Sequence, residues 1–183
     1  MGYIIPTEEL TPTHRANFRS QAVEAGIARA STGPKAFAAR EELISRAPQN
    51  NADFGKGAAL DFWATPALAA VGTLYTVFGA IPNPQLANNR LAVFYKVGVP
   101  TAPIPLSLLY FQLGAAAGTT KDILDLEQLS CSLVPEGYFS EPIVYDPLDV
   151  LNIRVYCRLA TGLLSRVILG GLIIEPRGIT ISG

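Results

Sequence analysis

Residues 149–160 read DVLNIRVYCRLA, and polar and apolar side chains alternate along most of this segment. In an extended chain Ile153, Val155 and Cys157 would share one face, and Arg154 would lie on the other. A period of two residues is typical of a β-strand that turns one face toward a hydrophobic core. The segment therefore predicts a half-buried strand.

Further runs of this kind occupy residues 51–183 and are separated by segments rich in Gly, Pro, Asn and Thr. Besides the segment above, they read ALDFWAT, AVGTLYTVFGAI, RLAVFYKVGV, IPLSLLYFQLG, DILDLEQLSCSLV and SRVILGGLIIEP. About seven or eight short strands with no repeated helix between them indicate antiparallel pairing. We expect a mostly β fold, an antiparallel, jelly-roll-like β-sandwich, with residues 51–183 as its domain.

The first 50 residues follow a different pattern and predict an α-helical N-terminal arm ahead of that domain. A first helix is expected from Pro12, with Thr11 as its N-cap, to the Gly-Pro pair at residues 33–34. A second helix is expected within residues 35–47, KAFAAREELISRA, which end before a proline.

Both predicted helices have narrow apolar stripes. Phe18 lies on the first stripe, while Phe37, Leu43 and Ile44 lie on or beside the second. Such helices need tertiary packing, because most helical stability in proteins comes from it. The stripes could pack on the β domain or on a neighbouring subunit, and in the second case Phe18, Phe37, Leu43 and Ile44 are the candidate partner-binding residues.

The composition favours oligomerisation. Charged residues make up 16% of the chain and hydrophobic residues 49%, against a usual charged share of about 25%. A domain of this size leaves roughly a third of its unfolded-chain surface exposed, so part of that surface should be apolar and covered by partners. We expect a homo-oligomer, a dimer or a trimer.

Two classes of partner are not expected. The net charge is −1, and the first 50 residues mix six basic with five acidic side chains, so no basic patch indicates nucleic-acid binding. Residues 62–81 form a charge-free run long enough to span a membrane. However, Pro66, Gly72 and Gly79 interrupt this run and no Lys or Arg cluster flanks it, so buried strand explains it better.

The sequence offers little for catalysis. Its one histidine, His14, lies in the first turn of the predicted helix, and the spacings of phosphate loops and zinc sites are missing. A hydrolase would have to use Asp125, Glu127 or Asp146, which a solvated strand face and a turn explain better. We predict that the chain is not an enzyme and has no catalytic, cofactor-binding or metal-binding residues.

One stretch carries a resemblance to a known family. Residues 107–157, SLLYFQLGAAAGTTKDILDLEQLSCSLVPEGYFSEPIVYDPLDVLNIRVYC, and then VILGGLIIEPRG resemble the β-sandwich of tailed-phage capsid decoration, or cement, proteins. Members of that family bind the outside of an assembled capsid shell and lock neighbouring subunits together. The resemblance implies a bacteriophage virion protein whose partners are capsid subunits and which uses no cofactor.

Two alternatives stay open, a protein of the capsid shell itself and a receptor- or glycan-binding tail module. The first ten residues, MGYIIPTEEL, lack the basic and apolar regions of a secretory signal. Synthesis in the host cytoplasm, followed by incorporation into the virion, is therefore the expected localisation.

Overall fold

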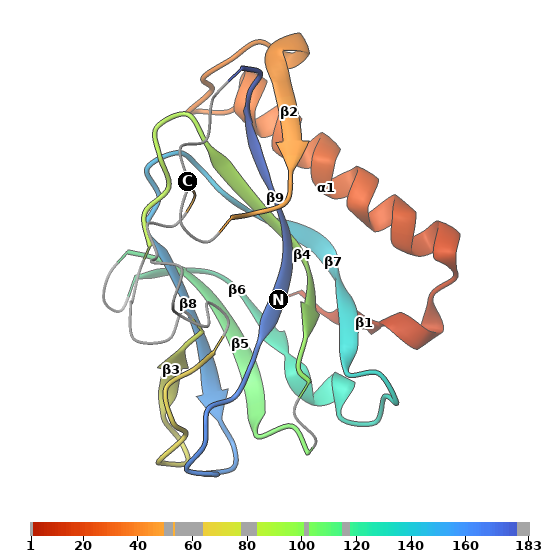
Figure 1. The fold of residues 1–183 in the computed structure, drawn as a ribbon, viewed down its shortest axis with the longest axis vertical. Helices are drawn as coiled ribbons and strands as arrows, with labels where there is room; N and C mark the ends of the chain where they lie inside the picture. Colours follow the sequence, from red (N-terminus) through yellow and green to blue (C-terminus); the bar gives the residue numbers. More distant parts are fainter. Residues whose placement is uncertain are drawn as a thin grey trace.

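The computed structural model describes residues 2–49, 53, 64–77, 84–100, 103–114 and 118–178. Within these ranges the chain forms two antiparallel sheets and one long helix, which lies across the outer face of one sheet (Figure 1). This arrangement confirms the predicted fold class, an antiparallel β-sandwich with an α-helical N-terminal region. Most of the predicted strand ALDFWAT and the end of AVGTLYTVFGAI lie outside the described residues.

The described strands are divided between a five-stranded and a four-stranded sheet. The first has the order β1 (Ile4–Pro6), β7 (Glu136–Tyr145), β4 (Leu91–Gly98), β9 (Ile168–Pro176) and β2 (Leu43–Arg46). The second has the order β3 (Leu74–Thr76), β8 (Leu151–Cys157), β5 (Leu106–Leu113) and β6 (Thr119–Asp125).

The strands pair from the middle of the sequence outward, as in a long hairpin that is folded over on itself. β5 pairs with β6, β4 with β7, β3 with β8 and β2 with β9, all antiparallel. From β2 to β9, successive strands alternate between the two sheets except β5 and β6, which are neighbours in one sheet. This is the eight-stranded jelly-roll arrangement, and β1 extends it at the edge of β7.

The main core lies between the sheets and is built by alternate residues of the strands. As the sequence predicts, Ile153, Val155 and Cys157 of β8 are all buried. Phe111 on β5 contacts Phe139 on β7, with ring centroids 5.6 Å apart in an edge-on geometry. Burying each such ring contributes about 1.5–3 kcal/mol, so both sheets are held to the same core.

Helix α1 (Pro12–Thr32) begins as predicted, because the Thr11 side chain accepts a hydrogen bond from the His14 amide and Pro12 occupies the first turn. The helix covers the outer face of the five-stranded sheet. Its buried side chains join a second hydrophobic cluster, which contains Ala22, Ala30, Leu43, Leu91, Val93, Leu172 and Ile174.

Gly26 is where the helix lies closest to the sheet. A Cβ atom at this position would come within 2.7 Å of Cγ1 of Ile174 and 2.8 Å of Cγ2 of Val93. A glycine inside a helix is ordinarily unfavourable by about 1 kcal/mol relative to alanine, but here its lack of a side chain allows close packing on β4 and β9.

The prediction of a second helix within residues 35–47 is wrong. That segment contains a short 3₁₀ helix, η2 (Arg40–Glu42), and then β2 (Leu43–Arg46), which pairs with the end of β9. Strand pairing is favoured over a helix here because it satisfies the backbone N–H and C=O groups at the edge of β9 and buries Leu43 beneath α1. The division into an arm and a domain at residue 50 stays a prediction, although β1 and β2 from this region belong to the five-stranded sheet.

The run DILDLEQLSCSLV also differs from expectation, since β6 ends at Asp125 and a 3₁₀ helix, η3 (Leu126–Leu129), follows. The Asp125 carboxylate accepts a hydrogen bond of 2.8 Å from the Glu127 amide. This side-chain cap competes with the strand ladder and starts the turn.

Four charged side chains, three buried and one partly buried, form a cluster that joins β2 and β9 to Arg90, the residue before β4. Arg46 Nε lies 2.6 Å from Glu175, and Arg46 also pairs with Asp53 at 2.6 Å. Arg90 completes the set, with contacts of 3.3 Å to Asp53 and 3.0 Å to Glu175. The two cations and two anions neutralise each other in a site from which water is largely excluded. Removing one of them would leave a buried charge without its full compensation, which is strongly destabilising.

A second ionic contact holds the last turn of α1 to the turn between β7 and β8. Arg29 donates two hydrogen bonds of 2.7 and 2.6 Å to the Asp146 carboxylate. Lys35 lies 2.7 Å from Asp149, whose carboxylate also accepts a hydrogen bond from the Asp146 amide. The turn expected at residues 146–149 is present, since the Asp149 amide donates to the Asp146 carbonyl over 3.1 Å. The side chain that accepts a local backbone hydrogen bond is that of Asp149, not that of Asp146 as the sequence predicts.

Asp146→Asn is expected to lower the free energy of unfolding at pH 7 by about 1–2 kcal/mol, since Arg29 loses its charged partner and is itself half exposed. The hydrogen bonds from Arg29 lower the pKa of Asp146 below its usual range. The contribution of the Asp146 ion pair to the free energy of unfolding is therefore fully present above the ordinary carboxyl pKa of about 3.9. It is lost as the pH falls through the lowered pKa of the folded state. Urea titrations at several pH values should show the gap between variant and wild type closing in acid.

Glu141→Gln is the control, because Glu141 is an exposed carboxylate on β7. It should change stability by less than about 0.5 kcal/mol at every pH. A gap for Asp146→Asn that stays constant down to pH 2 would contradict the assigned ion pair.

Candidate assembly surface

The four side chains predicted to bind partners do not form one surface. Phe18 stacks on Tyr138 of β7 with ring centroids 5.3 Å apart, and Phe37 packs against the cluster beneath α1. Leu43 is buried, whereas Ile44 on the same strand is exposed. Their role in binding stays a prediction, and three of the four make contacts within their own chain.

The three carboxylates considered for hydrolysis each have another structural partner. Asp125 caps η3, Glu127 lies 3.2 Å from Arg158, and Asp146 pairs with Arg29. In the described part of the chain, no group of His, Cys, Asp or Glu side chains has the arrangement of a metal site. No helix in the same ranges is both long and apolar enough to cross a membrane.

One end of the sandwich exposes many large aliphatic side chains. It is formed by the turn before β3, the loop between β8 and β9 and the loop before β7, at the lower end of the molecule in Figure 1. We call this surface the apolar end and define it by Val71, Leu74, Leu133, Val134, Leu159, Leu163, Leu164 and Ile168.

Backbone hydrogen bonds between two loops support the exposed leucines. The Leu68 amide donates to the Leu163 carbonyl, and the Gly162 amide donates to the Leu68 carbonyl, both over 3.0 Å. Deeper in the structure, the Thr65 amide donates to the Ser165 carbonyl over 2.8 Å. Gly162 has a φ of 67°, a conformation that glycine adopts without strain, so the turn can present the next two residues to solvent.

Leu163 and Leu164, which follow Gly162, are both largely exposed to solvent. Leu163 is 70% exposed and Leu164 is 63% exposed, while Leu133 in the loop before β7 reaches 94%. Isolated exposed leucines are common, but a group of them rimmed by polar residues marks an interaction site.

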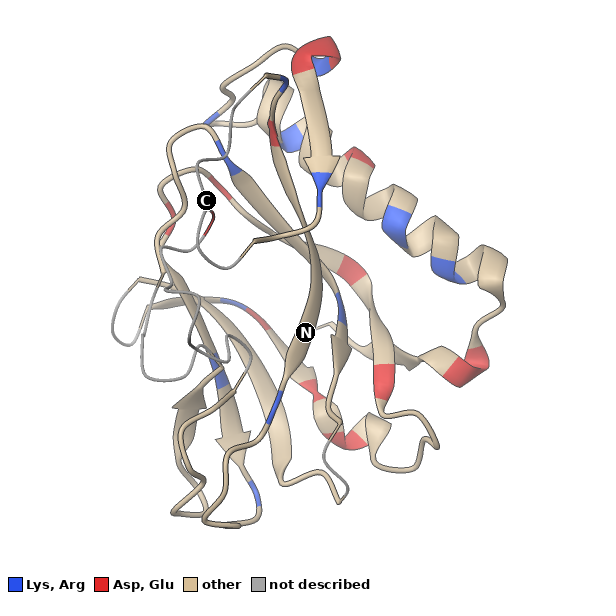
Figure 2. Ribbon diagram, in the orientation of Figure 1, with Lys and Arg blue, Asp and Glu red and all other residues tan. Residues whose placement is uncertain are grey.

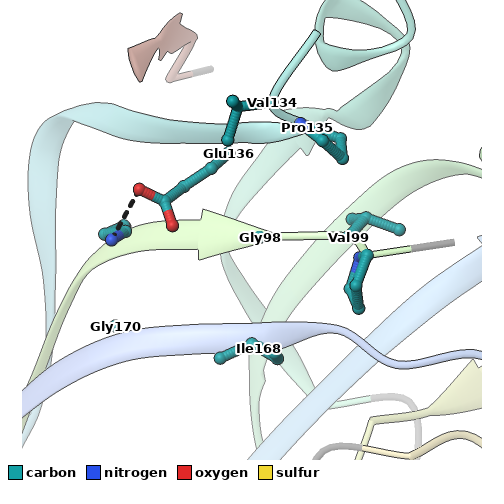
Figure 3. A pocket seen from close by; sticks show the side chains of 9 residues that line it. Gly98, Val99, Val134, Pro135, Glu136, Ile168 and Gly170 are labelled. Carbon is teal, nitrogen blue, oxygen red and sulfur yellow. Dashed lines mark ion pairs between the residues drawn. The ribbon is translucent and has the colours of Figure 1, made fainter. Parts of the chain in front are cut away.

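A hollow of about 240 Å³ lies on the same end, between the last residues of β4, the start of β9 and the segment that enters β7. Figure 3 shows the side chains of Val99, Val134, Pro135 and Ile168 around it, with Gly98 at its floor. The hollow is therefore lined mainly by carbon atoms.

Charge at the apolar end is of both signs: besides two ion pairs, the end carries exposed Arg166 in the loop between β8 and β9 and Glu8, whose carboxylate accepts a hydrogen bond from the Leu133 amide. Lys96 and Glu136 lie 2.6 Å apart beside the hollow, and Arg158 lies 3.2 Å from Glu127. Figure 2 shows few other charged residues over the lower loops of the sandwich. The surface thus combines exposed aliphatic groups with a rim that has no strong net charge.

This surface was not predicted, because residues 160–164, ATGLL, were interpreted as a loop that only connects two strands. The useful signal was a pair of leucines in a Gly-containing turn segment, where polar residues are usual. Leu133 and Val134 were missed for a related reason, since they were assigned to a strand that ends earlier in the structure.

Comparisons with known proteins identify no family for this chain. No family model and no curated protein matches it. A similar solved structure is the infectious bursal disease virus VP2 subviral particle, with 14% sequence identity and a TM-score of 0.38. The match covers 74% of this chain and 32% of that one, so the chain spans about a third of the length of that protein, and a likeness of this degree assigns no function.

Proposed function

We propose that this protein is a structural subunit of a virion and that neighbouring protein subunits cover its apolar end. The observation that carries the proposal is the group of eight large aliphatic residues exposed on the loops and strand ends at one end of the sandwich. Leaving such a group in water is unfavourable by roughly 25 cal/mol for each Å² of apolar surface. Contact with another apolar surface removes this cost.

Within that class, a capsid decoration subunit is the finer proposal. It is supported by the resemblance of residues 107–157 to decoration proteins and by the jelly-roll strand order, which occurs in viral capsid domains and also in lectins. The fold alone does not choose between these uses. The apolar end favours protein contacts over a glycan, because it is aliphatic, whereas an aromatic platform with amides and carboxylates would suit a sugar.

Immunogold labelling of particles purified from the native source tests the proposal. We expect the antibody to label the outside of intact particles at regular positions. Particles from which the protein has been stripped should rupture at a lower temperature, and adding the purified protein back should restore the original value. Particles that carry no label, before or after disruption, would overturn the virion proposal.

A further inference from the structure

We propose that the apolar end is covered by a second copy of this chain in a twofold dimer, in which Leu163 and Leu164 of each copy enter the hollow of the other. The inference rests on the proposed function, because it names the partner of the same surface.

The surface is self-complementary because it carries both protrusions and a hollow. Leu163 and Leu164 protrude from the loop between β8 and β9, and Ile168 at the start of β9 borders the hollow. Only five residue steps separate Leu163 from Ile168, so their Cα atoms are at most about 18 Å apart. A twofold axis between protrusion and hollow would create the same contact twice, as closed dimers require.

The hollow has room for an aliphatic side chain. Its volume is about 240 Å³, and a buried apolar cavity of roughly 150 Å³ already accepts a ring the size of benzene. Gly98 and Gly170 border it and contribute no side-chain bulk. A Cβ atom on Gly170 would lie 2.8 Å from Cβ of Lys96, so the strands approach closely at this wall.

The exposed area agrees with that of a dimer contact. With exposed fractions between 39% and 94%, the eight side chains present on the order of 800 Å², which is about what each partner contributes to a standard interface. The surface therefore has enough area for a dimer of ordinary stability.

The charges also favour a second copy. The Lys96–Glu136 and Arg158–Glu127 pairs are each neutral, and Arg166 and Glu8 at the same end have opposite signs, so two copies of the surface meet without a net charge of one sign. Such a rim gives no strong attraction to an anionic membrane, which is drawn to an excess of Lys and Arg.

Sedimentation of the full chain tests the inference. At 20 µM the wild type should sediment as a dimer, at twice the 19.5 kDa of the chain. The protrusion variant Leu163→Asp/Leu164→Asp and the hollow variant Val134→Asp should each weaken dimerisation at least 100-fold while keeping the wild-type circular dichroism spectrum. The control Leu148→Asp changes an exposed leucine in the turn between β7 and β8, away from the apolar end, and should remain dimeric.

Mixing the two variants gives a sharper result. A heterodimer keeps one intact contact, in which the leucines of the hollow variant enter the unmodified hollow of the protrusion variant. Native mass spectrometry should therefore detect more heterodimer than either homodimer.

A wild type that stays monomeric at 100 µM would overturn the inference, as would dimers that survive both sets of substitutions. Binding of a monomer to vesicles of phosphatidylcholine and phosphatidylserine would assign the surface to lipid instead. If the wild type is monomeric but the antibody still detects it on particles, the dimer proposal fails and the virion proposal stands. If the wild type is dimeric but is absent from particles, the virion proposal fails and the dimer proposal stands.

Discussion

Replacing Arg46 with methionine is expected to lower the free energy of unfolding by about 3–5 kcal/mol, because it breaks a buried ion pair by removing one partner. Asp53 and Glu175 are both almost fully buried, and each would lose a contact of 2.6 Å with Arg46. For a chain of this length the loss corresponds to a decrease of roughly 6–20 °C in Tm. Calorimetry and urea titration measure both quantities.

The hydrogen bonds from Arg46 to Asp53 raise the pKa of the guanidinium, so Arg46 stays charged throughout the pH range in which the protein folds. Arg40→Met is the matched control, because its ion pair with Glu24 has side-chain exposures of 56% and 61%. An exposed pair of this kind contributes at most about 1 kcal/mol. Equal losses for the two variants would contradict the role assigned to the buried cluster.

Deleting residues 1–50 is expected to abolish cooperative unfolding and to cause aggregation. The deletion removes β1, α1 and β2, which leaves Val93, Leu172 and Ile174 of the five-stranded sheet uncovered and opens the edge of β9. If these residues instead formed an arm that contacts partner subunits, the truncated domain would fold normally. Circular dichroism melting and size-exclusion chromatography separate the two outcomes, and a sharp transition in a monodisperse truncated protein would contradict the packing argument.

A point substitution tests the same packing without removing any strand. Gly26→Leu should cost about 1–3 kcal/mol or more, because its side chain would enter the space occupied by Ile174 and Val93. Ala28→Leu, on the exposed face of the same helix, should change stability by less than about 0.5 kcal/mol. Similar effects from both variants would show that α1 is not pressed against the sheet.

Features that depend only on neighbouring residues could be predicted before the structure was known. The alternation of Ile153, Val155 and Cys157 predicts β8, because a strand directs every second side chain to the same face. Thr11 and Pro12 likewise predict the start of α1, since a cap and its first turn involve only adjacent residues. The mostly β, jelly-roll-like fold followed from repeating such local patterns.

Features that join distant parts of the chain depend on the folded arrangement and could not be predicted from local patterns. Residues 43–46 become a strand because β9 offers them an open edge, and Arg46 meets Glu175 across a sequence separation of 129 residues. Leu163 and Leu164 are exposed because their loop is hydrogen-bonded to residues 65–68, almost a hundred positions away. Local periodicity contains no information on which edges pair or which loops meet, because those outcomes depend on the folded surface that distant segments present to one another.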